Sequence, residues 1–136
     1  TTEFNNGSIS YGQPSKNNRV IFGELVPYGK VWRTGANMAT EITFKKDVTF
    51  AGKKVKAGTY TLFTIPNAGE WTIILNSQLN QMGAFGYEKA KMNNIAEVTV
   101  PVILGLVTVE KLTIVPTDTE LTISWDNVVV KVPLKF

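Results

Sequence analysis

Apolar residues in this chain recur at every second position, which is the spacing of a β-strand with one buried face. The clearest case is the C-terminal segment NVVVKVPLKF, in which every second residue from Val128 to Phe136 is apolar. The preceding segment ELTISWD alternates in the same way, and Asp126-Asn127 provides a turn between the two. This pattern predicts a chain built mainly from strands.

The central segment, residues 47–76, predicts three or four further strands. Ala51-Gly52, Ala57-Gly58 and the segment 66–69 supply the turns that separate them. TYTLFTI and WTIIL are apolar on both faces, which is typical of central strands covered on both sides. Residues 77–93 lack strand character and contain two helix-breaking glycines, so we expect one or two helical turns within a loop there.

The length of 136 residues fits a single domain that can bury a core without disulfides. Eight to ten short strands with regularly spaced turns favour an all-β, antiparallel β-sandwich or jelly-roll-like barrel with one short insertion near 77–93. A parallel sheet would need crossover helices, for which the chain has no room. We therefore predict one β-sandwich domain over residues 1–136.

Composition excludes several function classes. The chain has no His and no Cys, which removes Ser-His-Asp and Cys-His catalysis and His-based zinc sites. It has only two arginines, Arg19 and Arg33, and a net charge of +3, so we expect no nucleic-acid partner. No apolar run reaches the roughly 18 residues of a transmembrane helix. We expect no metal, no cofactor and no catalytic residue, and therefore a protein that is not an enzyme.

The N-terminal arm, residues 1–12, is polar with spaced apolar residues. It predicts either a strand with an Asn-Gly turn or an arm that pairs elsewhere. Pairing with the sheet of a second copy would build a homo-oligomer or polymer, and possible filaments, by strand addition. The candidate assembly residues are Phe4, Ile9 and Tyr11.

The segment LVPYGKVWRTGAN, residues 25–37, concentrates hydrogen-bonding and stacking groups. Aromatic rings beside a guanidinium and an amide are typical of sites for sugars and small anions. The loop NQMGAFGY, residues 80–87, which contains Gln81, Phe85 and Tyr87, is either a rim of such a site or a plug for one end of the sandwich. The candidate ligand-binding residues are Tyr28, Lys30, Trp32, Arg33, Asn37 and Gln81.

The same segment also has a structural interpretation, which we favour at this point. PYG is a turn sequence, and Arg33 would then bond loop carbonyls or a carboxylate such as Glu24 or Glu41. Separately, five lysines between Lys45 and Lys56 fall on one predicted hairpin. They suit either polyanion binding or, as we favour, the protection of an exposed strand edge.

Five stretches resemble a bacterial family, the domain of unknown function DUF2911. They are YGQPS (11–15), RVIFGELVPYGKVWRTGANMAT (19–40), AGTYTLFTIP (57–66), EWTIILN (70–76) and QMGAFGY (81–87). The resemblance implies a compact β domain, usually carried behind a signal peptide in bacteria with an outer membrane. It implies an extracytoplasmic location after signal peptide removal, for which Thr1 would be the processed end, and it implies no activity.

These observations lead to one main expectation and two alternatives. We expect a non-enzymatic, extracytoplasmic structural or assembly subunit whose partner is itself. The first alternative is a small-ligand or carbohydrate-binding module that uses the loop from Tyr28 to Asn37. The second is a carboxylate-dependent hydrolase, which no particular pair of acidic residues supports.

Overall fold

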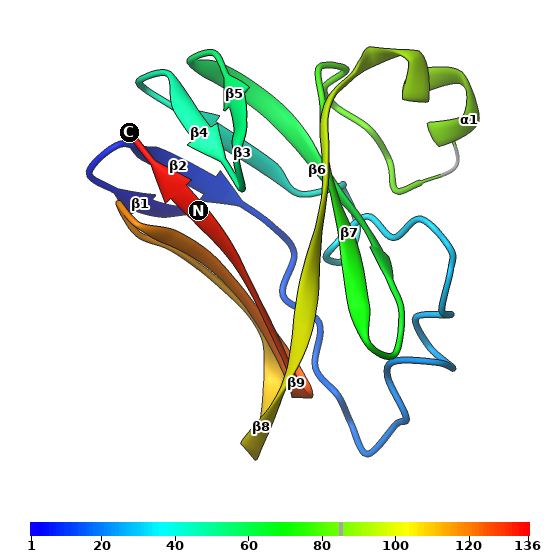
Figure 1. Cartoon of the computed structure of the whole chain (residues 1–136). Helices are drawn as coiled ribbons and strands as arrows, with labels where there is room; N and C mark the ends of the chain where they lie inside the picture. The colour runs from blue at the N-terminus through cyan, green and yellow to red at the C-terminus, as the bar shows by residue number, and fades with distance from the viewer. Residues whose placement is uncertain (85) are drawn as a thin grey trace.

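The computed structural model describes residues 1–84 and 86–136, so Phe85 lies outside the described residues (Figure 1). The described chain is almost entirely β-structure, as predicted. The strands are β1 (Thr2–Phe4), β2 (Gly7–Ser10), β3 (Glu41–Phe44), β4 (Val48–Phe50), β5 (Lys53–Val55), β6 (Gly58–Pro66), β7 (Glu70–Asn76), β8 (Asn94–Pro116) and β9 (Glu120–Lys135).

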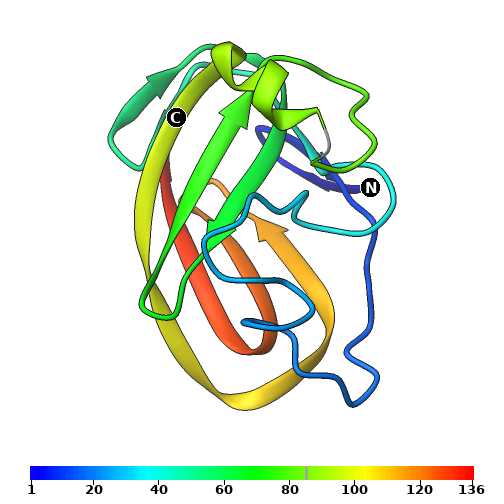
Figure 2. The same cartoon turned by 90° about the vertical axis from the view of Figure 1, so that its right-hand side faces the viewer.

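All nine strands belong to one antiparallel sheet in the order β1-β2-β3-β6-β7-β8-β9-β4-β5. The sheet does not close into a barrel within the described residues. β8 joins its two halves, because residues 94–101 pair with β7 whereas the later part of the strand pairs with β9. The β8–β9 register shifts twice, between Leu104 and Val109 and between Val109 and Thr113. These irregularities lie where β8 passes from one layer of the sandwich to the other (Figures 1 and 2).

The main core lies between the two layers and follows the alternation seen in the sequence. Leu62 and Ile73 from one layer, and Ile123 and Val132 from the other, are buried almost completely. A second, smaller cluster on the other side of β6 and β7 contains Phe63, Ile74, Tyr87 and Ala39. The prediction that these two strands are covered on both faces is therefore confirmed.

Residues 77–84 and 86–93 contain no strand, and this part of the chain ends in α1 (Tyr87–Ala90) and a 3-10 turn, η1 (Lys91–Asn93), as predicted. Asn76 at the end of β7 anchors this segment: its side-chain amide is buried and donates to the carbonyl of Ala90 at 2.8 Å. The anchored helix covers part of the smaller cluster through Tyr87.

The N-terminal arm pairs within the chain. β1 and β2 form a hairpin, and β2 continues the sheet by pairing with β3. The amides of Asn5 and Asn6 in the hairpin turn donate to the two carboxylate oxygens of Asp118, at 2.9 and 2.7 Å. Asp118 lies between β8 and β9, so the turn is tied to the opposite layer.

The three candidate assembly residues contact the chain's own core. The Phe4 ring lies 6.1 Å from the Phe136 ring, and Ile9 is fully buried. The Tyr11 hydroxyl oxygen accepts the amide of Ile114 at 3.1 Å. Pairing of the arm across a subunit boundary stays a prediction, and it would require these contacts to be made by a second copy.

Candidate anion-binding site

The segment around Trp32 runs along β6 and is fixed to it by backbone hydrogen bonds. The Trp32 amide donates to the Thr64 carbonyl at 2.7 Å, and the Thr64 amide donates back at 3.1 Å. Thr34, whose φ is 60°, bonds the Trp32 carbonyl and the Thr64 hydroxyl through its own hydroxyl. These bonds hold Trp32 and the neighbouring Arg33 in place without regular secondary structure.

Trp32 belongs to an aromatic cluster and is only 9% exposed. Its ring stacks on Trp125 with a centroid distance of 5.9 Å and an interplanar angle of 13°. Trp71 and Phe22 pack edge-on against it, at 6.1 and 6.0 Å. Because Trp32 is largely buried among these rings, it is not the open stacking platform that the sequence suggested.

Beside this cluster lies a cavity of about 200 Å³ that both arginines of the chain line. Arg33 comes from the segment along β6, and Arg19 comes from the loop after β2. The wall between them is mostly apolar. The lining residues are Pro14, Arg19, Leu25, Val26, Trp32, Arg33, Gly35, Ala36 and Trp125.

Arg33 has an unmet hydrogen-bonding requirement. Its Nε is buried and has no partner among the described residues. The structural interpretation expected Arg33 to bond backbone carbonyls or a carboxylate, and its Nε does not do so among the described residues. Glu41 instead accepts the amide of Asn80 at 2.9 Å, and the ion pairs between described residues do not involve Arg33. A buried guanidinium N–H without a partner costs about 1–3 kcal/mol.

Arg19 is held by its own loop. Its Nε donates to the Lys16 carbonyl at 3.0 Å, and its Nη2 donates to the Ser15 carbonyl at 2.6 Å. A guanidinium has five N–H donors, so these two bonds orient the group and leave donors for a ligand. None of the described residues that line the cavity is acidic, so its lining holds two positive charges and no negative one.

The structure separates the residues that the sequence grouped as one site. Trp32 and Arg33 line the two-arginine cavity, whereas Asn37 is exposed and lines a different cavity of about 370 Å³. Gln81 is buried, and its Nε2 donates to the Gln78 carbonyl at 2.8 Å. The backbone carbonyl of Gln81 accepts the amide of Ala39, so Gln81 supports the loop that follows β7.

Tyr28 and Lys30 are exposed on the loop and do not line either of these two cavities. Sequence reasoning missed Arg19 and Trp125 as partners of Arg33. Trp125 was assigned only to a strand face, and Arg19 was noted only as one of two arginines and as the first residue of the matched stretch 19–40. One usable signal was the scarcity of arginine, since two arginines in a lysine-rich chain are candidates for the same binding site.

Within the described residues, no three His, Cys, Asp or Glu side chains are grouped so that they could hold a metal ion. Likewise, none of the described helices has the length and apolar character needed to cross a bilayer.

The fold and this cavity define the class: a nearly all-β sandwich protein with a small two-arginine cavity beside a tryptophan cluster. Its family follows from comparison with known proteins, because residues 1–134 match the family described as "Protein of unknown function (DUF2911)". The chain belongs to that family, which confirms the resemblance seen in the sequence. Searches of curated proteins and of solved structures found no match.

Proposed function

We propose that this protein is a non-enzymatic binding module that holds a small organic carboxylate between Arg33 and Arg19. The observation that carries the proposal is the buried Nε of Arg33, which faces no protein acceptor among the described residues. A guanidinium is matched geometrically by a carboxylate, which accepts two parallel N–H bonds. The absence of His and Cys from the chain supports binding without chemistry.

The size and the walls of the cavity limit which ligands it can hold. Its volume of about 200 Å³ is below the range of about 300–1,000 Å³ that is typical of sites for drug-sized molecules. The apolar walls, which include Leu25, Val26 and Trp125, suit a short carbon skeleton better than a fully hydrated inorganic anion. A dicarboxylate of about four carbons would place one carboxylate near each arginine.

We also propose an extracytoplasmic location, which the resemblance to this family implies. Assembly by strand addition is the second candidate, since β1 and β5 are the terminal strands of the sheet. Each of these strands has three residues, so each offers a partner strand only a short edge to pair with. Filaments or large particles in light scattering and electron microscopy would favour assembly, and a monomer would favour ligand binding.

Succinate binding followed by nuclear magnetic resonance is the direct test of the carboxylate site. Because Trp32 and Trp125 line the cavity, we expect succinate to shift their indole N–H signals. Arg33→Gln removes charge-assisted hydrogen bonds worth about 1.5–3 kcal/mol, so the affinity should fall about tenfold to a hundredfold. The measurement is a titration of the natural protein and the variant.

Lys30→Gln is the matched control, since it removes one positive charge from the same loop but outside the cavity. It should leave succinate affinity unchanged within about twofold, apart from weak long-range attraction. Arg33→Met tests folding: it should keep or raise the free energy of unfolding, by about 1 kcal/mol, because the unmet N–H disappears. An equal loss of affinity in Lys30→Gln and Arg33→Gln, or no indole shift at millimolar succinate, would contradict the proposal.

A further inference from the structure

The cavity of about 370 Å³ that Asn37 lines lies between the end of β2, the segment before β3 and the loop after β7. Among the described residues it shares only Ala36 with the two-arginine cavity, so the inference below does not rest on the proposed carboxylate site. The residues that line it are Ser10, Tyr11, Gly12, Ala36, Asn37, Met38, Ala39, Glu41 and Asn80.

A row of polar side chains crosses the sheet and ends at this cavity. Its members lie directly opposite one another on β2, β3, β6 and β7: Ser10, Glu41, Thr61 and Asn76. Residues that are directly opposite on adjacent strands share a face, and the apolar residues that alternate with this row belong to the main core. The row therefore lies on the outer face of the sheet, the face turned away from the main core.

The loop after β7 covers one half of this row and leaves the other half open. Thr61 is buried, and its hydroxyl donates to the carbonyl of Gln78 at 2.7 Å. The loop ends over Glu41, whose Oε2 accepts the amide of Asn80 at 2.9 Å. Beyond this point Glu41 is half-buried and Ser10 is exposed. A carboxylate has about four acceptor sites, so the bond to Asn80 leaves acceptors for a ligand.

The segment 36–39 forms another wall, and close backbone packing fixes it. A Cβ added at Gly12 would overlap the carbonyl oxygen of Ala36, so the two segments are in direct contact. The amide of Ala39 donates to the carbonyl of Gln81 at 2.9 Å, which joins this wall to the loop after β7 (Figure 2). The cavity is therefore formed before a ligand binds, which lowers the entropic cost of binding.

The lining combines one carboxylate with neutral polar groups. None of the described residues that line the cavity is basic, whereas Ser10, Asn37 and Asn80 carry both donors and acceptors. An anion would face the carboxylate of Glu41 without a lining cation. A small organic cation would use only acceptors, and it would approach a chain whose net charge is +3. A neutral ligand with several hydroxyl groups uses the donors and the acceptors together.

We propose that this cavity binds a neutral monosaccharide whose ring hydroxyls donate to the Glu41 carboxylate and bond the amides of Asn37 and Asn80. Ser10 lies directly opposite Glu41 on the same face, so its hydroxyl reaches the same sugar. The volume of about 370 Å³ is near the lower end of the range of about 300–1,000 Å³ for small-molecule sites, which suits a single sugar ring.

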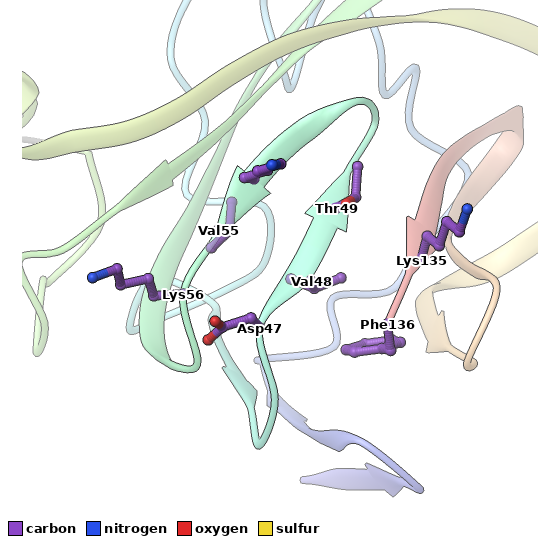
Figure 3. Close-up of a pocket in the computed structure, with 8 residues that line it drawn as sticks. Asp47, Val48, Thr49, Val55, Lys56, Lys135 and Phe136 are labelled. Carbon is purple, nitrogen blue, oxygen red and sulfur yellow. The ribbon is translucent and has the colours of Figure 1, made fainter.

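The cavity of about 530 Å³ beside the β4–β5 hairpin offers no such combination (Figure 3). Thr49 pairs with Lys54 and with Lys135, so these three side chains share one face. Val48 and Val55 alternate with them and are buried in the main core. The accessible face therefore presents mainly charge, which fits lysines that protect an exposed strand edge.

The test follows the backbone amide signals by nuclear magnetic resonance during titrations with glucose, galactose and mannose. We expect at least one of these hexoses to give saturable shifts at Ser10, Asn37, Glu41 and Asn80, with a millimolar Kd. The indole signals that report on succinate should stay in place. Failure of the sugar site is then distinguishable from failure of the carboxylate site.

Two variants with matched controls test the residues that bind the sugar. Glu41→Gln keeps an acceptor for the Asn80 amide but loses charge-assisted hydrogen bonds, so the affinity should fall about tenfold. Glu70→Gln removes the charge of an exposed residue outside the cavity, and it should change the affinity by less than about twofold. Asn37→Gly removes the amide but keeps the φ of 63°, so the affinity should fall about threefold without loss of stability. Asn18→Gly is its control, since Asn18 is exposed outside the cavity with a φ of 58°.

Several outcomes would overturn the proposal. If none of the three hexoses gives saturable shifts at these amides, the cavity does not bind a monosaccharide. If cyclohexanol binds as tightly as the best hexose, the polar groups do not select the ligand. If methylammonium binds more tightly than every hexose, the carboxylate serves a cation. An equal loss of affinity in Glu70→Gln and Glu41→Gln would show that Glu41 does not contact the sugar.

Discussion

Replacing Trp71 by Ala is expected to lower the free energy of unfolding by about 3–5 kcal/mol. Trp71 is 1% exposed on β7, and its ring lies 5.1 Å from Phe22 and 6.1 Å from Trp32. Removing it opens a cavity at the centre of the aromatic cluster, whose stacked members cannot move inward without losing their own contacts. Because natural domains are stable by about 5–15 kcal/mol, the variant should be marginal at 37 °C. Urea unfolding followed by circular dichroism measures the loss.

Two variants control for this effect. Trp71→Phe keeps an aromatic ring and should cost roughly half as much or less. Met92→Ala removes a side chain that is 84% exposed, and it should change stability by less than about 0.5 kcal/mol. The aromatic cluster also forms one wall of the two-arginine cavity, so Trp71→Ala should weaken succinate binding. A Trp71→Ala protein as stable as the natural one would contradict the packing described above.

Replacing Gly7 by Ala is expected to separate the N-terminal hairpin from the sheet. A Cβ at this position would overlap the carbonyl oxygen of Thr43 on β3, where β2 and β3 pair. Backbone atoms cannot yield as a flexible side chain can, so β2 must move away or the strand pair must distort. We expect a loss of about 1–3 kcal/mol and faster hydrogen exchange of the β2 amides.

Gly69→Ala is the matched control, since no heavy atom lies within 4 Å of an added Cβ and Gly69 has no positive φ. It should change the free energy of unfolding by less than about 0.5 kcal/mol.

The Gly7 variant also tests strand addition. If the arm pairs with a second copy, its amide protection should depend on protein concentration, whereas pairing with its own β3 makes protection independent of concentration. Unchanged β2 protection in Gly7→Ala would contradict the observed register.

Much of the fold could be predicted because local signals agreed with tertiary packing. The turn at Ala51-Gly52 adopts positive φ at both residues, 45° and 88°, and the alternation around Ile123 and Val132 matches the buried face. The continuous strand β8 could not be predicted. Within residues 94–116, Gly105 can mark a bulge, and it lies inside the first register shift, but which layers the two parts of the strand join is decided by packing.

The site was predicted only in part. Trp32 and Arg33 were among the candidates, since adjacent aromatic and cationic side chains are visible in a short window. Their partners Arg19 and Trp125 come from a separate loop and from the first half of β9, and no periodicity links such positions. For the same reason, the sequence could not show that the Nε of Arg33 has no described partner, because the acceptors around a side chain are set by the fold.

By itself, the sequence determined the all-β class, the short helical segment after β7 and the exclusion of His- and Cys-based chemistry. It also placed several turns, but the turn predicted at Asp126-Asn127 was wrong, because β9 runs without a break from Glu120 to Lys135. These properties depend on residue type and short-range spacing, which are present in the chain before it folds. Only the tertiary structure decided that both arginines converge on one cavity, that Lys54 and Lys135 flank Thr49, and that Gln81 supports a loop. Convergence of this kind depends on strand order and register, which follow from the packing of the whole core.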